Sequence, residues 1–197
     1  MSFPVAQPSG PNASNGAPGQ RFVSLRDYPR QPWPPVADES RAGVSAPPPL
    51  RQSLSPDGVS WVAAHGGAGT STLTTVLGGV DLGCRWPDPA QAEPARVLLV
   101  ARTHAGGILA ASRALNALRE GRHPDGLQLI ALVLVADSPG RLPQALRRQI
   151  RMLRSAVRMR QIPWIPEWRL GRTPKKLPKE VVRLSAMAGP AAADRTW

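Results

Sequence analysis

Residues 65–72 (HGGAGTST) form a glycine-rich stretch that follows an apolar run and ends in a cluster of hydroxyl side chains. Glycines in such a turn let backbone N–H groups converge, and a helix that follows adds the positive end of its dipole, so the pattern can hold a phosphate. The nucleotide-binding residues that it predicts are Gly66, Gly67, Ala68, Gly69, Thr70, Ser71 and Thr72. The hydroxyls of Ser71 and Thr72 are available to Mg²⁺, so ATP or ADP with Mg²⁺ is the expected ligand. The alternative is a turn that only redirects the chain.

The phosphate-binding pattern GxxxxGK[ST] has a lysine after its last glycine, and this chain has Thr70 at that position. Backbone amides must then carry the phosphate charge, and burying a triphosphate without a cation is costly. Residues 80–95 are interrupted by prolines and offer only Asp81 and Asp88 as aspartates. We therefore expect weak nucleotide binding, assign no catalytic residue, and favour a protein that is not an enzyme.

Histidine and cysteine residues are too few and too scattered for a standard zinc site, with three His and one Cys in the chain. His65 could approach a phosphate as a proton donor, or could simply close the end of a strand. His104 follows Thr103 after an apolar run, where ligands of open α/β sheets bind, but no carboxylate partner is evident. We interpret His104 as structural and predict no metal ligand.

A concentrated positive charge distinguishes the last third of the chain. The chain carries 25 Lys or Arg against 13 Asp or Glu, for a net charge of +12, and residues 141–183 hold most of the excess. A helix predicted after Pro143 places four arginines on one stripe beside its apolar face: Arg147, Arg151, Arg154 and Arg158. Such a stripe favours DNA or an acidic protein surface as a partner, and a solvated face is the alternative.

Hydrophobic periodicity predicts an α/β fold with a small, mostly parallel sheet flanked by helices. Continuous apolar runs indicate strands covered on both faces, and amphipathic segments between them indicate helices. The expected strands are residues 61–64, 96–101, 129–136 and 160–165, and the expected helices are residues 71–77, 106–119 and the segment after Pro143. Residues 80–95 are expected to be irregular.

Composition divides the chain into three parts. Residues 1–55 hold many of the 23 prolines among small polar residues and are interpreted as a disordered tail and linker. Residues 56–172 form the α/β domain, and residues 173–197 are a basic, then Ala-rich, tail with little sign of packing. No secretory signal and no apolar run long enough to cross a bilayer is evident, so a cytoplasmic protein is the simplest interpretation.

The stretch HGGAGTST resembles the deviant Walker A loop of the ParA/MinD family, whose pattern is KGGxGK[ST]T. Gly66, Gly67, Gly69, Ser71 and Thr72 match, whereas His65 and Thr70 stand at the two lysine positions. The resemblance implies a reduced P-loop domain and leaves a homodimer open. It further implies a non-hydrolysing, nucleotide-responsive accessory or regulatory factor in replicon maintenance or DNA transfer.

Two alternatives to that function stay open: a nucleotide-independent nucleic-acid-binding or scaffold protein, and a weak ATPase. The HGGAG start also resembles a group of actinobacterial proteins without an assigned activity.

Overall fold

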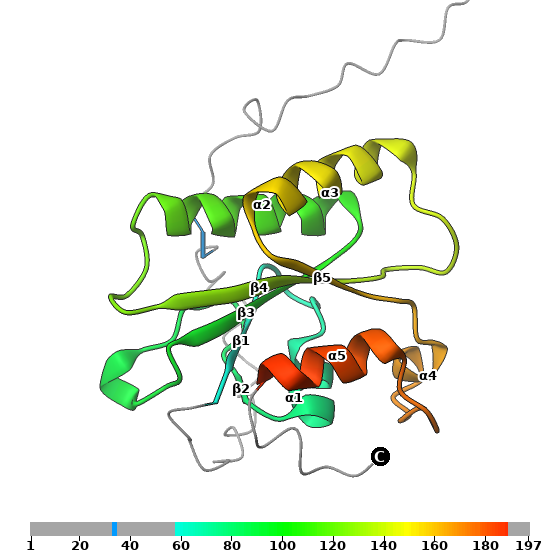
Figure 1. The fold of residues 1–197 in the computed structure, drawn as a ribbon, viewed down its shortest axis with the longest axis horizontal. Coiled ribbons are helices and arrows are strands. Elements are labelled where there is room, and N and C mark those ends of the chain that lie inside the picture. Colours follow the sequence, from blue (N-terminus) through cyan, green and yellow to red (C-terminus); the bar gives the residue numbers. More distant parts are fainter. Residues whose placement is uncertain (1–32, 35–57, 189–197) are drawn as a thin grey trace, which may run out of the picture. The chain divides into compact units, whose positions relative to one another are not determined.

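A five-stranded, all-parallel sheet forms the centre of the protein. The computed structural model describes residues 33–34 and 58–188, all within one compact unit of residues 31–197. In chain order the strands are β1 (Ser60–Ala63), β2 (Val80–Asp81), β3 (Arg96–Arg102), β4 (Gln128–Val135) and β5 (Met159–Ile162), as Figure 1 shows. The predicted α/β fold is confirmed, with every strand pair parallel.

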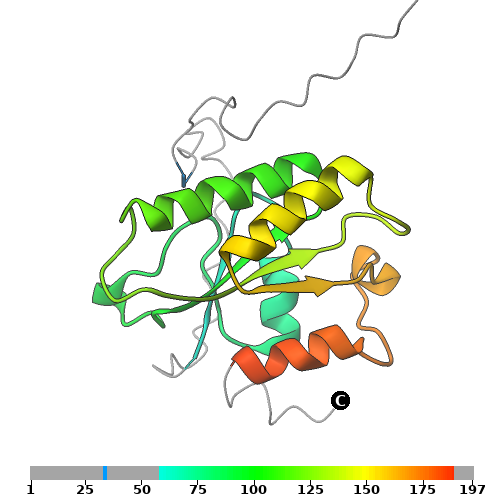
Figure 2. The same cartoon turned by 45° about the horizontal axis from the view of Figure 1, so that its top comes forward.

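Helices cover both faces of the sheet (Figures 1 and 2). One face carries α1 (Thr70–Leu77) and α5 (Lys179–Ala188), and the other carries α2 (Ala105–Arg119) and α3 (Gln144–Ala156). A single-turn helix, α4 (Pro166–Arg169), follows β5, and a short 3₁₀ turn, η2 (Pro89–Gln91), precedes β3. The helices predicted at residues 71–77, 106–119 and after Pro143 are confirmed to within a residue or two.

The middle strands are apolar along their length because both of their faces are covered. Successive side chains of a strand point to opposite faces, so β3 contributes to two separate cores. Leu98 and Val100 pack in the core under α1 and α5, whereas Val97, Leu99 and Ala101 pack in the core under α2 and α3. This double burial explains why β3 and β4 read as continuous apolar runs in the sequence.

The strand order β2-β1-β3-β4-β5 determines where a ligand site can form. After β1 the chain builds β2 on one side, and it then returns to build β3 on the other side of β1. Such a reversal opens a crevice at the carboxyl ends of the two strands beside it, and ligands of open α/β sheets bind in that crevice. Here the crevice lies between the loops that follow β1 and β3.

Residues 80–95 are not wholly irregular, and this corrects the sequence interpretation. Val80 and Asp81 form β2, with Val80 N–H donating to the Val59 carbonyl and Leu82 N–H donating to the Trp61 carbonyl. A strand of two residues is too short to produce a periodic signal. Its presence raises the predicted four strands to five and places Asp81 beside β1.

The prediction that residues 173–197 form a tail with little packing is wrong for residues 179–188, which form α5. Val181 and Leu184 are fully buried in the core under α1 and α5, and Leu177 joins them. The spacing of Val181, Leu184 and Ala188 gives the apolar stripe that docks on the sheet. Residues 189–197 lie outside the described part.

Trp33 lies in the stretch predicted as a tail, residues 1–55, yet its side chain is buried. Its indole N–H donates to the Ala64 carbonyl at 3.0 Å, and its ring packs on Trp86 with centroids 4.2 Å apart. The rest of the predicted tail, apart from Pro34, lies outside the described residues.

Truncation of Leu184 to Ala should destabilise the protein by about 2–5 kcal/mol, because it leaves a cavity between α5 and the sheet. Val182→Ala is the matched control, since Val182 lies on the same helix and is 50% exposed. Urea denaturation of both variants measures the difference. Equal stabilities for the two variants would mean that α5 does not pack as described.

Candidate functional site: the glycine-rich turn at the switch point

The turn between β1 and α1 adopts a backbone that only glycine takes easily. Gly67 and Gly69 have φ values of +75° and +104°, in the left-handed region. Gly69 is the N-cap of α1, and neither a capping side chain nor an acidic residue satisfies the first turn of that helix. The N–H groups at the start of α1 are therefore available to an anion.

His65 fastens this turn to β3. Its Nδ1 donates to the Gly66 carbonyl at 2.8 Å, and its Nε2 accepts the backbone N–H of Arg102 at 3.1 Å. Both ring nitrogens are occupied in the neutral form, with the proton on Nδ1. Burial lowers the pKa of His65 below its ordinary value, and the nearby His104 and Arg102 act in the same direction. His65 thus holds the loop in place, and its one N–H is used by the Gly66 carbonyl and not by a phosphate.

Arg102, the last residue of β3, places its guanidinium beside the turn. Its Nε donates to the Gly67 carbonyl at 3.3 Å, and its Nη1 donates to the Ala136 carbonyl at 3.1 Å. Burial lowers its pKa, which the nearby Asp137 raises in part. The sequence lacks a lysine in the loop, and the fold supplies a cation from the neighbouring strand.

The start of α2 packs against the junction at which His65 bonds to the end of β3. It comes so close to this junction that only glycine fits. A Cβ on Gly107 would lie 2.4 Å from the Arg102 carbonyl oxygen and 2.9 Å from Nε2 of His65. His104 caps α2, with its Nδ1 accepting the N–H of Gly107, and its ring contacts His65 edge to face. The structural interpretation of His104 agrees with this arrangement, and the two histidines meet without forming an acid–base pair.

Ser71 and Asp81 meet on the outer side of the turn. The Ser71 hydroxyl donates to Oδ2 of Asp81 at 2.6 Å, and Oδ1 of Asp81 accepts the N–H of Gly83 at 3.0 Å. The sequence analysis assigned no carboxylate to the site, and β2 brings Asp81 to it. A hydroxyl at the start of the loop helix and a carboxylate from another segment are the protein groups that hold Mg²⁺ in phosphate-loop proteins.

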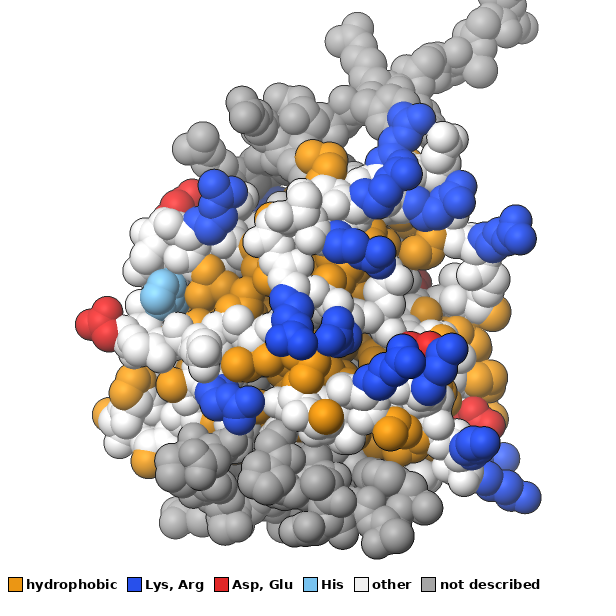
Figure 3. All heavy atoms as spheres, in the orientation of Figure 1, with side chains coloured by type: hydrophobic (Ala, Val, Ile, Leu, Met, Phe, Trp, Pro, Cys, Tyr) orange, Lys and Arg blue, Asp and Glu red, His pale blue; other side chains and the backbone are white. Residues whose placement is uncertain are grey.

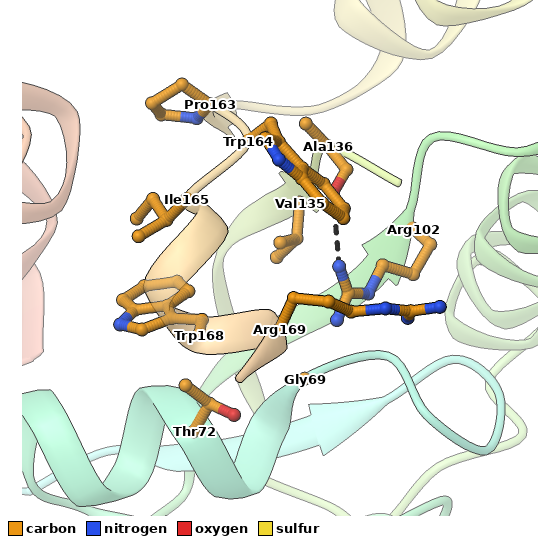
Figure 4. Close-up of a pocket in the computed structure, with 10 residues that line it drawn as sticks. All are labelled: Gly69, Thr72, Arg102, Val135, Ala136, Pro163, Trp164, Ile165, Trp168 and Arg169. Carbon is orange, nitrogen blue, oxygen red and sulfur yellow. Dashed lines mark hydrogen bonds between the residues drawn. The ribbon is translucent and has the colours of Figure 1, made fainter. Parts of the chain in front are cut away.

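A cavity of about 210 Å³ opens beside the turn (Figure 4). Gly69 and Thr72 form its floor, and Arg102 and Arg169 project into it from β3 and α4. Its other walls come from the end of β4, from the segment between β5 and α4, and from α4 itself: Val135, Ala136, Pro163, Trp164, Ile165 and Trp168.

The predicted loop residues therefore lie in different environments. Gly69 and Thr72 line the cavity, whereas Gly66, Gly67 and Ser71 are exposed away from it. Ala68 and Thr70 are buried, so the Thr70 side chain does not occupy the place of a phosphate-facing lysine. Sequence reasoning did not assign Arg102, Arg169 or Asp81 to this site. The signal for Arg102 was a charged residue that ends an apolar strand at the switch point.

The four arginines predicted as a basic stripe are exposed, but they do not all lie on one helix. Arg147, Arg151 and Arg154 belong to α3, which ends at Ala156, and Arg158 lies in the link to β5. Arg154 donates to the Gln161 side chain at 3.4 Å. Within the described residues, the ion pairs Arg85–Glu93 and Arg122–Glu120 involve none of the four.

Within residues 33–34 and 58–188, no helix is long and apolar enough to cross a membrane. The same residues contain no group of three or more His, Cys, Asp or Glu side chains that could hold a metal ion.

The fold and the site together define a doubly wound α/β protein with a glycine-rich turn and an arginine-lined cavity at its switch point. Residues 57–184 match a family of unknown function (DUF6668), and the chain belongs to that family. No curated protein and no solved structure matches the chain.

Acid should destabilise the protein through His65. Because the folded pKa of His65 lies below the unfolded value of about 6.5, the unfolded state binds the proton more readily. Stability is then full above about pH 6.5 and falls as the pH drops toward the folded pKa. Denaturant unfolding between pH 7.5 and 5 should show a shallower fall for His65→Gln than for the wild type. His123→Gln, which changes a histidine outside the junction, should retain the wild-type fall. A slope unchanged by His65→Gln would contradict this assignment.

Proposed function

We propose that the protein is a non-hydrolysing, nucleotide-responsive binding protein that receives phosphate at residues 65–72. The observation that carries the proposal is Arg102, whose guanidinium is held beside the glycine-rich turn by the Gly67 and Ala136 carbonyls. The uncapped start of α1 adds N–H donors on the same side. Together they provide what a phosphate requires, a cation and converging donors.

The proposal includes a degenerate ParA/MinD-like origin and an accessory or regulatory role in replicon maintenance or DNA transfer, in the cytoplasm. Its support is the match of Gly66, Gly67, Gly69, Ser71 and Thr72 to that family's loop. Hydrolysis is not part of it, because residues 65 and 70 are not lysines and Arg102 donates to main-chain carbonyls.

Mg²⁺ fits this proposal through Ser71 and Asp81. A hydroxyl and a carboxylate oxygen are suitable ligands for Mg²⁺, which keeps several waters and otherwise binds phosphate oxygens. With ATP or ADP bound, the ion would neutralise phosphate charge next to the turn. In the structure the two side chains bond to each other and lie outside the cavity.

Gly67→Ala should weaken nucleotide binding by about tenfold, because a left-handed Ala costs about 1–2 kcal/mol and the loop must move to relieve that strain. Gly126→Ala is a matched control, since its φ of +78° is close to the +75° of Gly67 and both positions have open space. Calorimetric titration with ATP and ADP, with and without Mg²⁺, measures the affinities.

Phosphate release from the same samples should be absent. Turnover at about 1 s⁻¹ or faster would show an ordinary enzyme and overturn the non-hydrolysing proposal. Equal affinities for Gly67→Ala and wild type would mean that the turn is not part of the binding site.

Nucleic-acid binding through the arginine stripe is a second candidate. Lys and Arg side chains gather over α3 and toward the β5 edge in Figure 3, with few acidic side chains among them. Like charges that lie close together repel unless an anion neutralises them, and a phosphate backbone would do so.

Replacing Arg147, Arg151, Arg154 and Arg158 with Gln should reduce the slope of log affinity against log salt by about four units. The control replaces Lys175, Lys176, Lys179 and Arg183 with Gln, which removes the same charge from exposed positions near α5. Fluorescence anisotropy with a labelled duplex at several salt concentrations gives both slopes. A stripe variant with wild-type affinity and slope would mean that these arginines form a solvated face and do not bind nucleic acid.

A further inference from the structure

The cavity meets the glycine-rich turn at one end only. Gly69 and Thr72 line it, and Gly66, Gly67 and Ser71 do not. Arg102 both lines the cavity and donates to the Gly67 carbonyl, so its guanidinium lies between the cavity and the first half of the turn. A row of phosphates running along the whole turn would therefore have to displace Arg102.

Two guanidinium groups converge on this cavity, and neither forms an ion pair with a carboxylate of the part of the chain that the structure describes. Arg102 and Arg169 extend next to each other in Figure 4, and the charge of Arg169 lowers the pKa of Arg102. Asp137 is the acidic group that acts on Arg102 from the end of β4. Within the described residues, the Arg169 side chain has no hydrogen bond or ion pair. An anion with two negative charges would relieve the repulsion and bond to both arginines.

Flat and apolar side chains form the wall opposite the turn. Trp164 and Trp168 line the cavity together with Pro163 and Ile165. Trp164 is half-buried, so part of its ring is free to contact a ligand. An aromatic side chain next to an arginine pair suits a ring that stacks while an attached anion is bound.

The volume limits the size of the ligand. About 210 Å³ is less than the roughly 300 Å³ at which pockets for drug-sized molecules begin. The phosphate and the nearest part of a mononucleotide fit such a space, whereas three phosphates do not fit there together with a sugar and a base.

We propose that the cavity binds the phosphomonoester of a nucleoside, with the phosphate between Arg102, Arg169 and the start of α1 and the base against Trp164. This inference rests on the proposed phosphate-binding function and narrows its ligand. A single phosphate needs no Mg²⁺, so binding is independent of the Ser71–Asp81 pair. The same chemistry exists in a free mononucleotide and at the 5′-phosphorylated end of a nucleic acid strand.

Calorimetric titration of the full chain distinguishes these ligands. The four ribonucleoside 5′-monophosphates are compared with the corresponding nucleosides, with Mg²⁺-ATP and with inorganic phosphate. The expected result is that at least one monophosphate binds about tenfold or more tightly than both its nucleoside and Mg²⁺-ATP, with or without EDTA. A short oligonucleotide with a 5′-phosphate and one with a 5′-hydroxyl then separate the free from the polymeric source.

Arg169→Gln should weaken monophosphate and inorganic phosphate binding by about tenfold, because it removes a charge-assisted hydrogen bond. Arg172→Gln is the matched control, since Arg172 is exposed and lies outside the cavity lining. Trp164→Ala should weaken monophosphate binding by a similar factor and leave inorganic phosphate unaffected.

Tighter binding of Mg²⁺-ATP than of every monophosphate would overturn this inference and leave the proposed function standing. If no phosphate-containing ligand binds, both are overturned. Equal effects of Arg169→Gln and Arg172→Gln on monophosphate binding would mean that the phosphate does not bind in the cavity, which overturns the inference.

Discussion

The bond between the Arg102 N–H and Nε2 of His65 is the constraint on which the switch point depends. It joins the end of β3 to the start of the glycine-rich turn, and it requires a neutral imidazole. Gly107 packs on both partners at a distance that no side chain could occupy. Because three segments meet there, the position of the turn, the direction of the Arg102 side chain and the entry of α2 are fixed together.

The site carries a positive charge because this arrangement holds the Arg102 side chain beside the turn. A phosphate loop ordinarily carries its cation within the loop, whereas here the position after Gly69 is a buried threonine. The cation comes from the adjacent strand and is anchored by two main-chain carbonyls. This cation lies beside the loop and away from its exposed first glycines. The positive charge therefore lies at a different place from that of a lysine within the loop.

The sequence was sufficient for the elements with strong periodic patterns and insufficient for features that depend on how elements meet. The apolar runs of β3 and β4 and the glycine spacing before α1 predicted their structures because each signal is local. Arg102 could not be assigned, since its neighbours Gly67 and Ala136 lie 35 and 34 residues away in the chain. Asp81 was not assigned to the site because a strand of two residues gives no periodic hydrophobic pattern in the sequence. α5 was missed among prolines and lysines, although Val181, Leu184 and Ala188 carried a helical spacing.

Trp33 bears on where the folded unit can be cut. The family match begins at residue 57, but the indole of Trp33 covers Trp86 and satisfies the carbonyl of Ala64, the residue just before His65. A fragment limited to residues 57–184 would expose one tryptophan to water and leave that carbonyl without its donor at the entrance to the turn. It would also end within α5, before Met187 and Ala188. A recombinant fragment that preserves the site should therefore start before Trp33 and extend beyond Ala188.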